Sequence, residues 1–113
     1  MTTITDEFMR QMMTSTRPYT LVILKTRPGR SEAGADAIIW EHGRRNFELR
    51  ARGLLLIVCP IRDGSDTAGI GIFNASPAEV EQLMAEDPAI KADILSYEIH
   101  ATRSFPGDCL AGA

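Results

Sequence analysis

Hydrophobic residues recur with two different periods along this chain, and the order of those periods restricts its fold. Strict alternation or a short continuous apolar run predicts a strand, whereas steps of three and four residues predict a helix. Strands are expected at residues 19–26, 54–59, 67–74 and 95–102, and helices at residues 35–52 and 77–86. The order βαββαβ predicts an α+β protein with a ferredoxin-like fold, in which a four-stranded antiparallel sheet carries two helices on one face.

Local signals mark the ends of both helices. Ser76 and Glu79 have the spacing of a capping box, and Pro77 occupies the first helical position. Gly53 follows the last periodic residue of the longer helix, a place where glycine often ends a helix. Asp87 precedes a proline, and this pair predicts an end or a break of the second helix.

The two helices can cover only one face of this sheet, yet the first two strands are apolar on both faces. Such strands are typical of a sheet that is covered on both sides. No other segment is long enough to cover the second face, so we expect a second copy of the chain to cover it, sheet against sheet, in a homodimer. The alternative is that short apolar strands look two-sided by chance.

Composition narrows the class of protein. The length of 113 residues and the apolar fraction of 44% fit one compact domain. The net charge is −3 and the arginines are scattered, so we expect no nucleic-acid partner. The longest apolar run is too short to cross a bilayer, and the N-terminal residues lack the pattern of a signal peptide. With only two cysteines, we expect a cytoplasmic protein without a membrane partner.

We expect three segments along the chain. Residues 1–18 form an appendage with a short helix at 6–13, residues 19–105 form the ferredoxin-like domain, and residues 106–113 form a tail. Spacings of three and four place Met9 with Met12 and Met13 on one side of the short helix. The appendage is either a lid or partner-binding arm, or a helix that packs on the domain or frays.

The sequence lacks the motifs that bind phosphate, dinucleotides or metals, so we expect neither a cofactor nor a metal. Gly69 and Gly71 lie within an expected strand and share one face, which is not the arrangement of a phosphate loop. Two glycines in a central strand remove side-chain volume. They either open a pocket or let a helix pack closely, and the pattern supports both interpretations equally.

His42 is the most informative residue. It falls on the apolar stripe of the longer helix, so it should face the sheet. A histidine there can act as a general acid or base, and the competing interpretation is a hydrogen-bonded core histidine. A general base needs a group to orient it, and the chain offers Asp63, Asp66 and Asp87 near element ends. Each also has a simpler role, as a turn former or as the residue before proline.

Arginines follow His42 along the same helix. A solvated helix face is the ordinary explanation for such a group, and stabilisation of a developing oxyanion is the functional one. The members of the group are Arg44, Arg45, Arg50 and Arg52.

Several of these features stand in a fixed order. His42 lies eleven residues before Gly53, and Gly53 lies seven before Pro60. After them come the acidic turn 63–66, the glycine-containing strand segment 68–71, the Ser76–Glu79 pair and the Asp87–Pro88 pair. From Tyr19 to Phe105 this ordered set resembles the YCII-related (YciI-like) family of the dimeric α/β-barrel superfamily. The chain has Gly43, Cys59, Ala89 and Asp93 where that family usually has leucine, glycine, an aromatic residue and glycine.

The resemblance implies ferredoxin-like protomers that pair as a dimeric α/β barrel, with His42 and Asp87 as a catalytic pair in a cleft. It also implies cofactor-independent elimination or isomerisation of a small oxygenated ring compound. His42 would be the general base, and Asp87 its orienting or acidic partner. The candidate substrate-binding residues are Asp63, Gly69, Gly71 and Arg45. The alternatives are a non-catalytic dimer that binds a small ligand or regulates another protein, and a structural dimer with a buried histidine.

Overall fold

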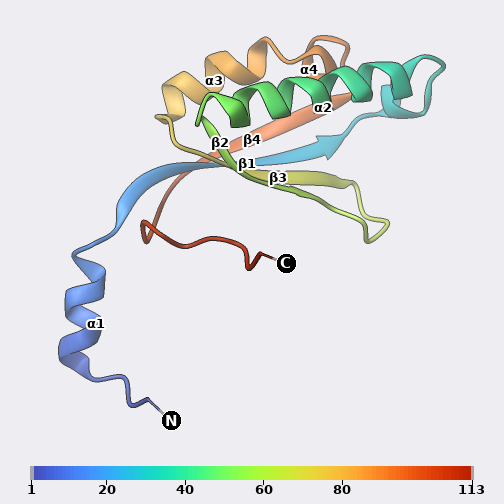
Figure 1. The fold of residues 1–113 in the computed structure, drawn as a ribbon. Coiled ribbons are helices and arrows are strands. Elements are labelled where there is room, and N and C mark those ends of the chain that lie inside the picture. The colour runs from blue at the N-terminus through green and yellow to red at the C-terminus, as the bar shows by residue number, and fades with distance from the viewer. Residues whose placement is uncertain (1, 113) are drawn as a thin grey trace.

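The computed structural model describes residues 2–112. A four-stranded sheet carries helices on one face, and a short N-terminal helix stands away from this body (Figure 1). In chain order the elements are α1 (Asp6–Met13), β1 (Arg17–Thr26), a 3₁₀ turn (Pro28–Ser31), α2 (Ala35–Ala51), β2 (Leu55–Pro60), β3 (Thr67–Phe73), α3 (Pro77–Ala85), α4 (Pro88–Lys91) and β4 (Leu95–Ser104).

The strands lie in the order β2-β3-β1-β4, and every neighbouring pair is antiparallel. This topology confirms the predicted ferredoxin-like fold. The register pairs Val22 of β1 with Gly71 of β3 on one side and with Ile99 of β4 on the other. These three residues therefore share the face that the helices cover.

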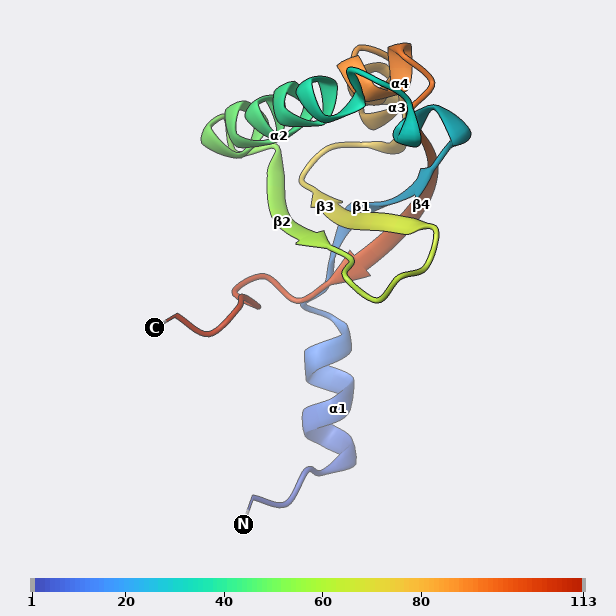
Figure 2. The same cartoon turned by 90° about the vertical axis from the view of Figure 1, so that its right-hand side faces the viewer.

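Figure 2 shows α2, α3 and α4 on one side of the sheet. The capping box that begins α3 is present in full, because Ser76 accepts a hydrogen bond from the Glu79 backbone and the Glu79 side chain accepts one from Ser76. The longer helix ends before Gly53, as expected. Arg52 is its C-cap residue, and Gly53 lies in the left-handed region with a φ of 74°.

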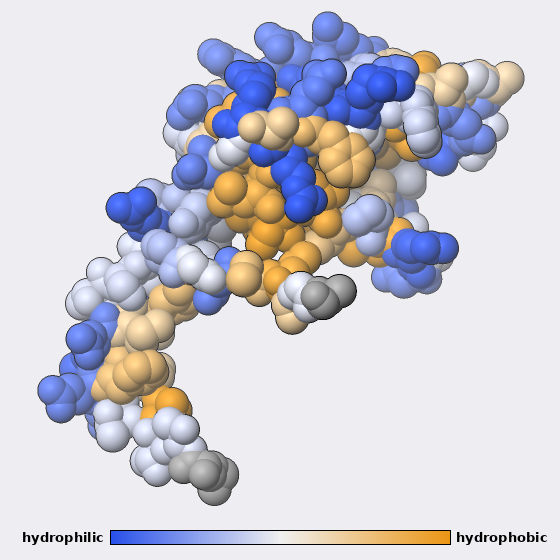
Figure 3. Space-filling view, in the orientation of Figure 1, coloured by the Kyte–Doolittle hydropathy of each residue, from blue (hydrophilic) through white to orange (hydrophobic). Residues whose placement is uncertain are grey.

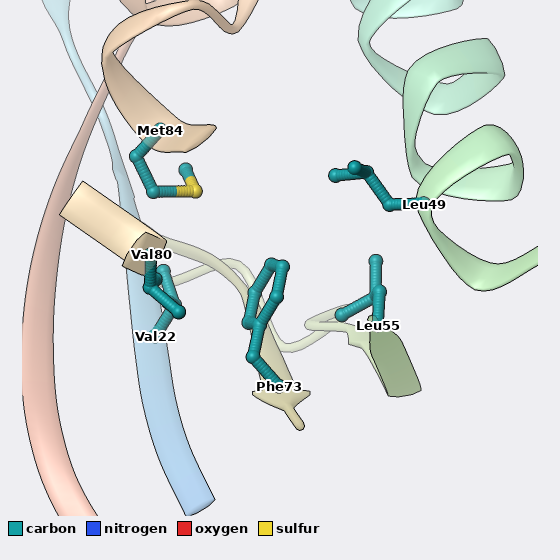
Figure 4. Close-up of a cluster of buried hydrophobic side chains, with 6 residues drawn as sticks. All are labelled: Val22, Leu49, Leu55, Phe73, Val80 and Met84. Carbon is teal, nitrogen blue, oxygen red and sulfur yellow. The ribbon is translucent and has the colours of Figure 1, made fainter. Parts of the chain in front are cut away.

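The core lies between the helices and the sheet. Its larger cluster joins α2, α3 and the three strands β1, β2 and β3, and its members are Val22, Leu49, Leu55, Phe73, Val80 and Met84 (Figure 4). A smaller cluster near the start of α2 contains Ala35, Ala89, Ile94 and Leu95. The two clusters hold α2 near both of its ends, through Ala35 and Leu49.

The element boundaries differ from the predictions at several ends. Helix α2 and strand β3 each end one residue earlier than predicted, and β4 continues two residues further. The first strand begins at Arg17, so two residues expected in the appendage belong to the sheet. The second strand lies one residue later than predicted and carries an irregularity between Leu55 and Ile57. The helix expected to reach residue 86 ends at Ala85, and a separate short helix follows from Pro88, capped by the Asp87 side chain.

The short N-terminal helix forms with its expected bounds, but it does not pack on the domain. Thr5 caps it, and none of its residues is buried. Phe8, Met9 and Met13 are exposed, at 46%, 44% and 43%, and Met12 is half-buried. No helix among residues 2–112 is long and apolar enough to span a bilayer.

No helix of the described part of the chain covers the second face of the sheet. The register places Leu21 and Ile23 of β1 and Ile70 and Ile72 of β3 on this face. The segment after β4 turns back beneath the sheet (Figure 1), and its residues form a groove together with Ile72 and parts of β2.

Candidate active site

A cavity of about 620 Å³ lies between α2 and the sheet, a size typical of small-molecule sites. We call it the α2 cavity. Figure 3 shows a hollowed, largely hydrophobic area below the helices on this side of the molecule. The wall from α2 consists of Ile39, His42, Gly43, Asn46, Phe47 and Arg50, and the opposite wall comes mainly from β1, β2 and β3.

Gly69 and Gly71 both line this cavity, which decides between the two interpretations of the glycine pair. A Cβ atom at Gly71 would lie 3.2 Å from Leu55 Cδ1 and 3.3 Å from Phe73 Cε2, and one at Gly69 would lie 3.2 Å from the Cys59 carbonyl oxygen. These nearest neighbours belong to the sheet, and none of them is a helix atom. The glycines therefore leave space under α2, and no helix packs closely on them.

His42 faces this cavity from the middle of α2. Its Nδ1 atom lies 2.7 Å from Oδ2 of Asp87, and only 12% of the histidine side chain and 1% of the aspartate side chain are exposed. The two residues stand 45 positions apart in the sequence. Helix α2 supplies the histidine, and the break between α3 and α4 supplies the aspartate, so the fold itself creates the pair.

Asp87 is held by two further interactions. Its Oδ1 atom accepts a hydrogen bond from the Ala89 backbone at 2.9 Å and so caps α4. Arg45 Nη1 lies 3.8 Å from the other oxygen, Oδ2, and places a positive charge beside the buried carboxylate. The carboxylate therefore has a fixed orientation toward His42 and a cation that offsets its charge.

The second ring nitrogen of His42 meets Asn46, one turn along the same helix, with 3.3 Å between Nε2 and Nδ2. A carboxylate can only accept hydrogen bonds, so Nδ1 must donate to Asp87. The neutral ring then has a lone pair on Nε2, and the Asn46 amide can donate to it. The nitrogen that can accept a proton is therefore the one on the side of Asn46, a residue that also lines the cavity.

No protein-family model matches this chain, and no curated protein matches it.

The structure brings some of the predicted site residues together and leaves others apart. His42, Gly69 and Gly71 line the cavity, and Asp87 lies directly behind His42. Arg45 is not among the lining residues, because its guanidinium points toward Asp87 and Glu86, at 3.8 Å from each carboxylate. Arg45 therefore lies behind the pair and does not line the cavity.

Asp63 lies in the exposed loop between β2 and β3 and is not a lining residue of the cavity. Hydrogen bonds from the Ser65 side chain and backbone lower the pKa of the Asp63 carboxyl. This is the behaviour of a turn former, and it is Ser65, two residues later, that reaches the cavity wall.

Two polar residues of the cavity wall were not among the predicted site residues: Asn46 had no assigned role, and Arg50 was considered only as a member of the arginine group. Both follow His42 at steps of four residues, so the helical period that placed His42 also places them on its face. No group of three or more His, Cys, Asp or Glu side chains within residues 2–112 is arranged to hold a metal ion.

Proposed function

We propose that this protein is a cofactor-independent enzyme that moves a proton on a small oxygenated organic molecule, with His42 as the general base. The observation that supports it best is the contact of His42 with a buried carboxylate on one side and with a cavity on the other. Asp87 fixes the ring and stabilises the imidazolium that forms when the ring takes up a proton. Only 12% of the His42 side chain is exposed to solvent.

The chemistry follows from the position of Nε2. It takes a proton from a carbon next to a carbonyl group, and the electron pair of the broken C–H bond moves onto the carbonyl oxygen. Return of the proton to another carbon gives isomerisation, and departure of a leaving group from the neighbouring carbon gives elimination. For Nε2 to take this proton, the Asn46 amide must release its hydrogen bond to that nitrogen, and the amide can then donate to the developing oxyanion.

The resemblance to the YCII-related family supports the same assignment. His42 and Asp87 match the motif residues of that family, and 2.7 Å separates Nδ1 of His42 from Oδ2 of Asp87. Asp93 stands where that family has glycine, and it takes a left-handed backbone conformation with a φ of 56°, which glycine adopts most readily.

The resemblance and the apolar second face of the sheet also favour a homodimer. Cys59 and Cys109 are free thiols, which fits the reducing cytoplasm that we propose as the location.

Exchange of carbon-bound hydrogen in D₂O tests the proposal without knowledge of the natural substrate. Proton NMR would follow the loss of signal from the hydrogens on the carbon next to the carbonyl group. The panel consists of small lactones and cyclic ketones, some of them bearing a carboxylate. We expect the full chain to accelerate exchange for at least one ring class over buffer and over the same amount of heat-denatured protein. Exchange at the buffer rate for every compound would contradict a proton-transfer enzyme, and binding without exchange would favour a ligand-binding protein.

A further inference from the structure

The charges on the wall of the α2 cavity are of one sign. None of the described residues that line it is acidic, while Arg30 and Arg50 both contribute to the wall. The remaining surface is mostly apolar, with Val22, Leu55 and Phe73 among its members. Such a cavity favours a ligand that has an apolar body and a negative charge.

The two arginines differ in what already binds them. Arg30 Nη1 lies 2.8 Å from Oδ1 of Asp36, so its charge is matched within the chain. For Arg50, no carboxylate lies within ion-pair distance among residues 2–112. Arg50 is therefore the lining cation that can take a charge from a ligand.

Arg50 also lies on the same side of α2 as the proposed base, His42. His42, Asn46 and Arg50 follow one another at steps of four residues along α2, and all three line the cavity. At a rise of about 1.5 Å per residue, Arg50 lies about 12 Å along the helix axis from His42, and its long side chain can reach back over part of that distance. One ring with a short acidic arm fits such a span.

We propose that the α2 cavity binds a small carboxylic acid with an apolar ring, its carboxylate on the Arg50 guanidinium and its ring against the glycine-lined sheet. The guanidinium presents paired N–H donors that match a carboxylate. The inference that the bound acid is a substrate of His42 rests on the proposed function. The binding itself does not depend on turnover.

Two matched pairs of probes separate charge from shape: phenylacetate with phenylacetamide, and 2-naphthylacetate with 2-naphthylacetamide. Dissociation constants would be taken from backbone amide shifts of the full chain in NMR titrations. We expect the acid of at least one pair to bind about 10-fold more tightly than its amide, as for a charged hydrogen bond. In Arg50→Gln that ratio should fall to about 3-fold or less.

Arg44→Gln is the matched control. Arg44 is a neighbour on the same helix, but its side chain is 59% exposed, it pairs with Glu41, and it does not line the cavity. We expect this variant to keep the wild-type ratio, because it removes the same charge from the chain without touching the wall.

Arg50 also borders the groove under the C-terminal segment, so the place of binding must be measured. Gly71 lines only the α2 cavity and Gly107 lines only the groove. Shifts at the Gly71 amide support the inference, and shifts confined to Gly107 overturn it. Equal binding of acid and amide, a ratio unaffected by Arg50→Gln, or no binding of either acid also overturns it. Because this readout needs no exchange, its failure is distinct from failure of the proton-transfer assay.

Discussion

Replacement of Asp87 by alanine is expected to lower the free energy of unfolding by about 3–5 kcal/mol, the cost of breaking a buried ion pair. The Asp87 side chain is 1% exposed, and its Oδ2 atom lies 2.7 Å from His42 Nδ1 and 3.8 Å from Arg45 Nη1. It also accepts the hydrogen bond that caps α4. Its removal takes the nearby carboxylate away from the buried Arg45 Nη1, which has no hydrogen-bond partner among residues 2–112. Urea unfolding followed by circular dichroism measures the loss.

Two further variants isolate the reason. Asp36→Ala removes an aspartate that is 92% exposed and paired with Arg30, so its cost should stay within about 1 kcal/mol. Asp87→Asn keeps a good helix cap but removes the charge, so it should fall between the wild type and Asp87→Ala. A loss under about 1 kcal/mol for Asp87→Ala would contradict a structural role for the pair.

Replacement of His42 by glutamine is expected to slow the exchange reaction by about 10²–10⁴-fold, the usual contribution of a general base. Glutamine has a similar polar character and can still donate a hydrogen bond to Asp87, but it cannot take up a proton. The comparison uses the compound that wild-type protein exchanges fastest, with the rate measured by proton NMR in D₂O. Circular dichroism of the variant checks that the fold is kept.

His100 offers a matched control, since it is the only other histidine of the sequence. It lies on β4, its side chain is 54% exposed, and it does not line the α2 cavity. We expect His100→Gln to exchange at the wild-type rate. Equal slowing in both variants, or no slowing in His42→Gln, would rule out His42 as the base.

The sequence predicts the fold well because the four strands and the longer helices each carry a local signal. The period of α2 places His42 toward the sheet, and the capping box at Ser76 places the start of α3. The alternation of β3 predicts that Gly69 and Gly71 share a face. These are short-range properties, which one stretch of sequence determines largely by itself.

The site is less accessible from sequence, because its partners come together only through the fold. The residue pattern alone leaves Asp63, Asp66 and Asp87 open, and only the family resemblance points to Asp87. It is the packing of α4 against α2 that brings Asp87 to His42. Arg45 follows the helical period, yet whether it faces the cavity or a carboxylate depends on where Asp87 lies. Helix α4 spans only four residues, too few for a period to be recognised.

The most direct test of the central claim is the protonation pattern of the His42 ring in the full chain. Long-range ¹H–¹⁵N correlation at about pH 9, where an ordinary imidazole is neutral, distinguishes a protonated ring nitrogen from one with a lone pair. The structure predicts a protonated Nδ1, held by Asp87, and an Nε2 that carries the lone pair and shifts when phenylacetate is added. A proton on Nε2 and none on Nδ1, with no response to the acid, would contradict a base that faces the cavity.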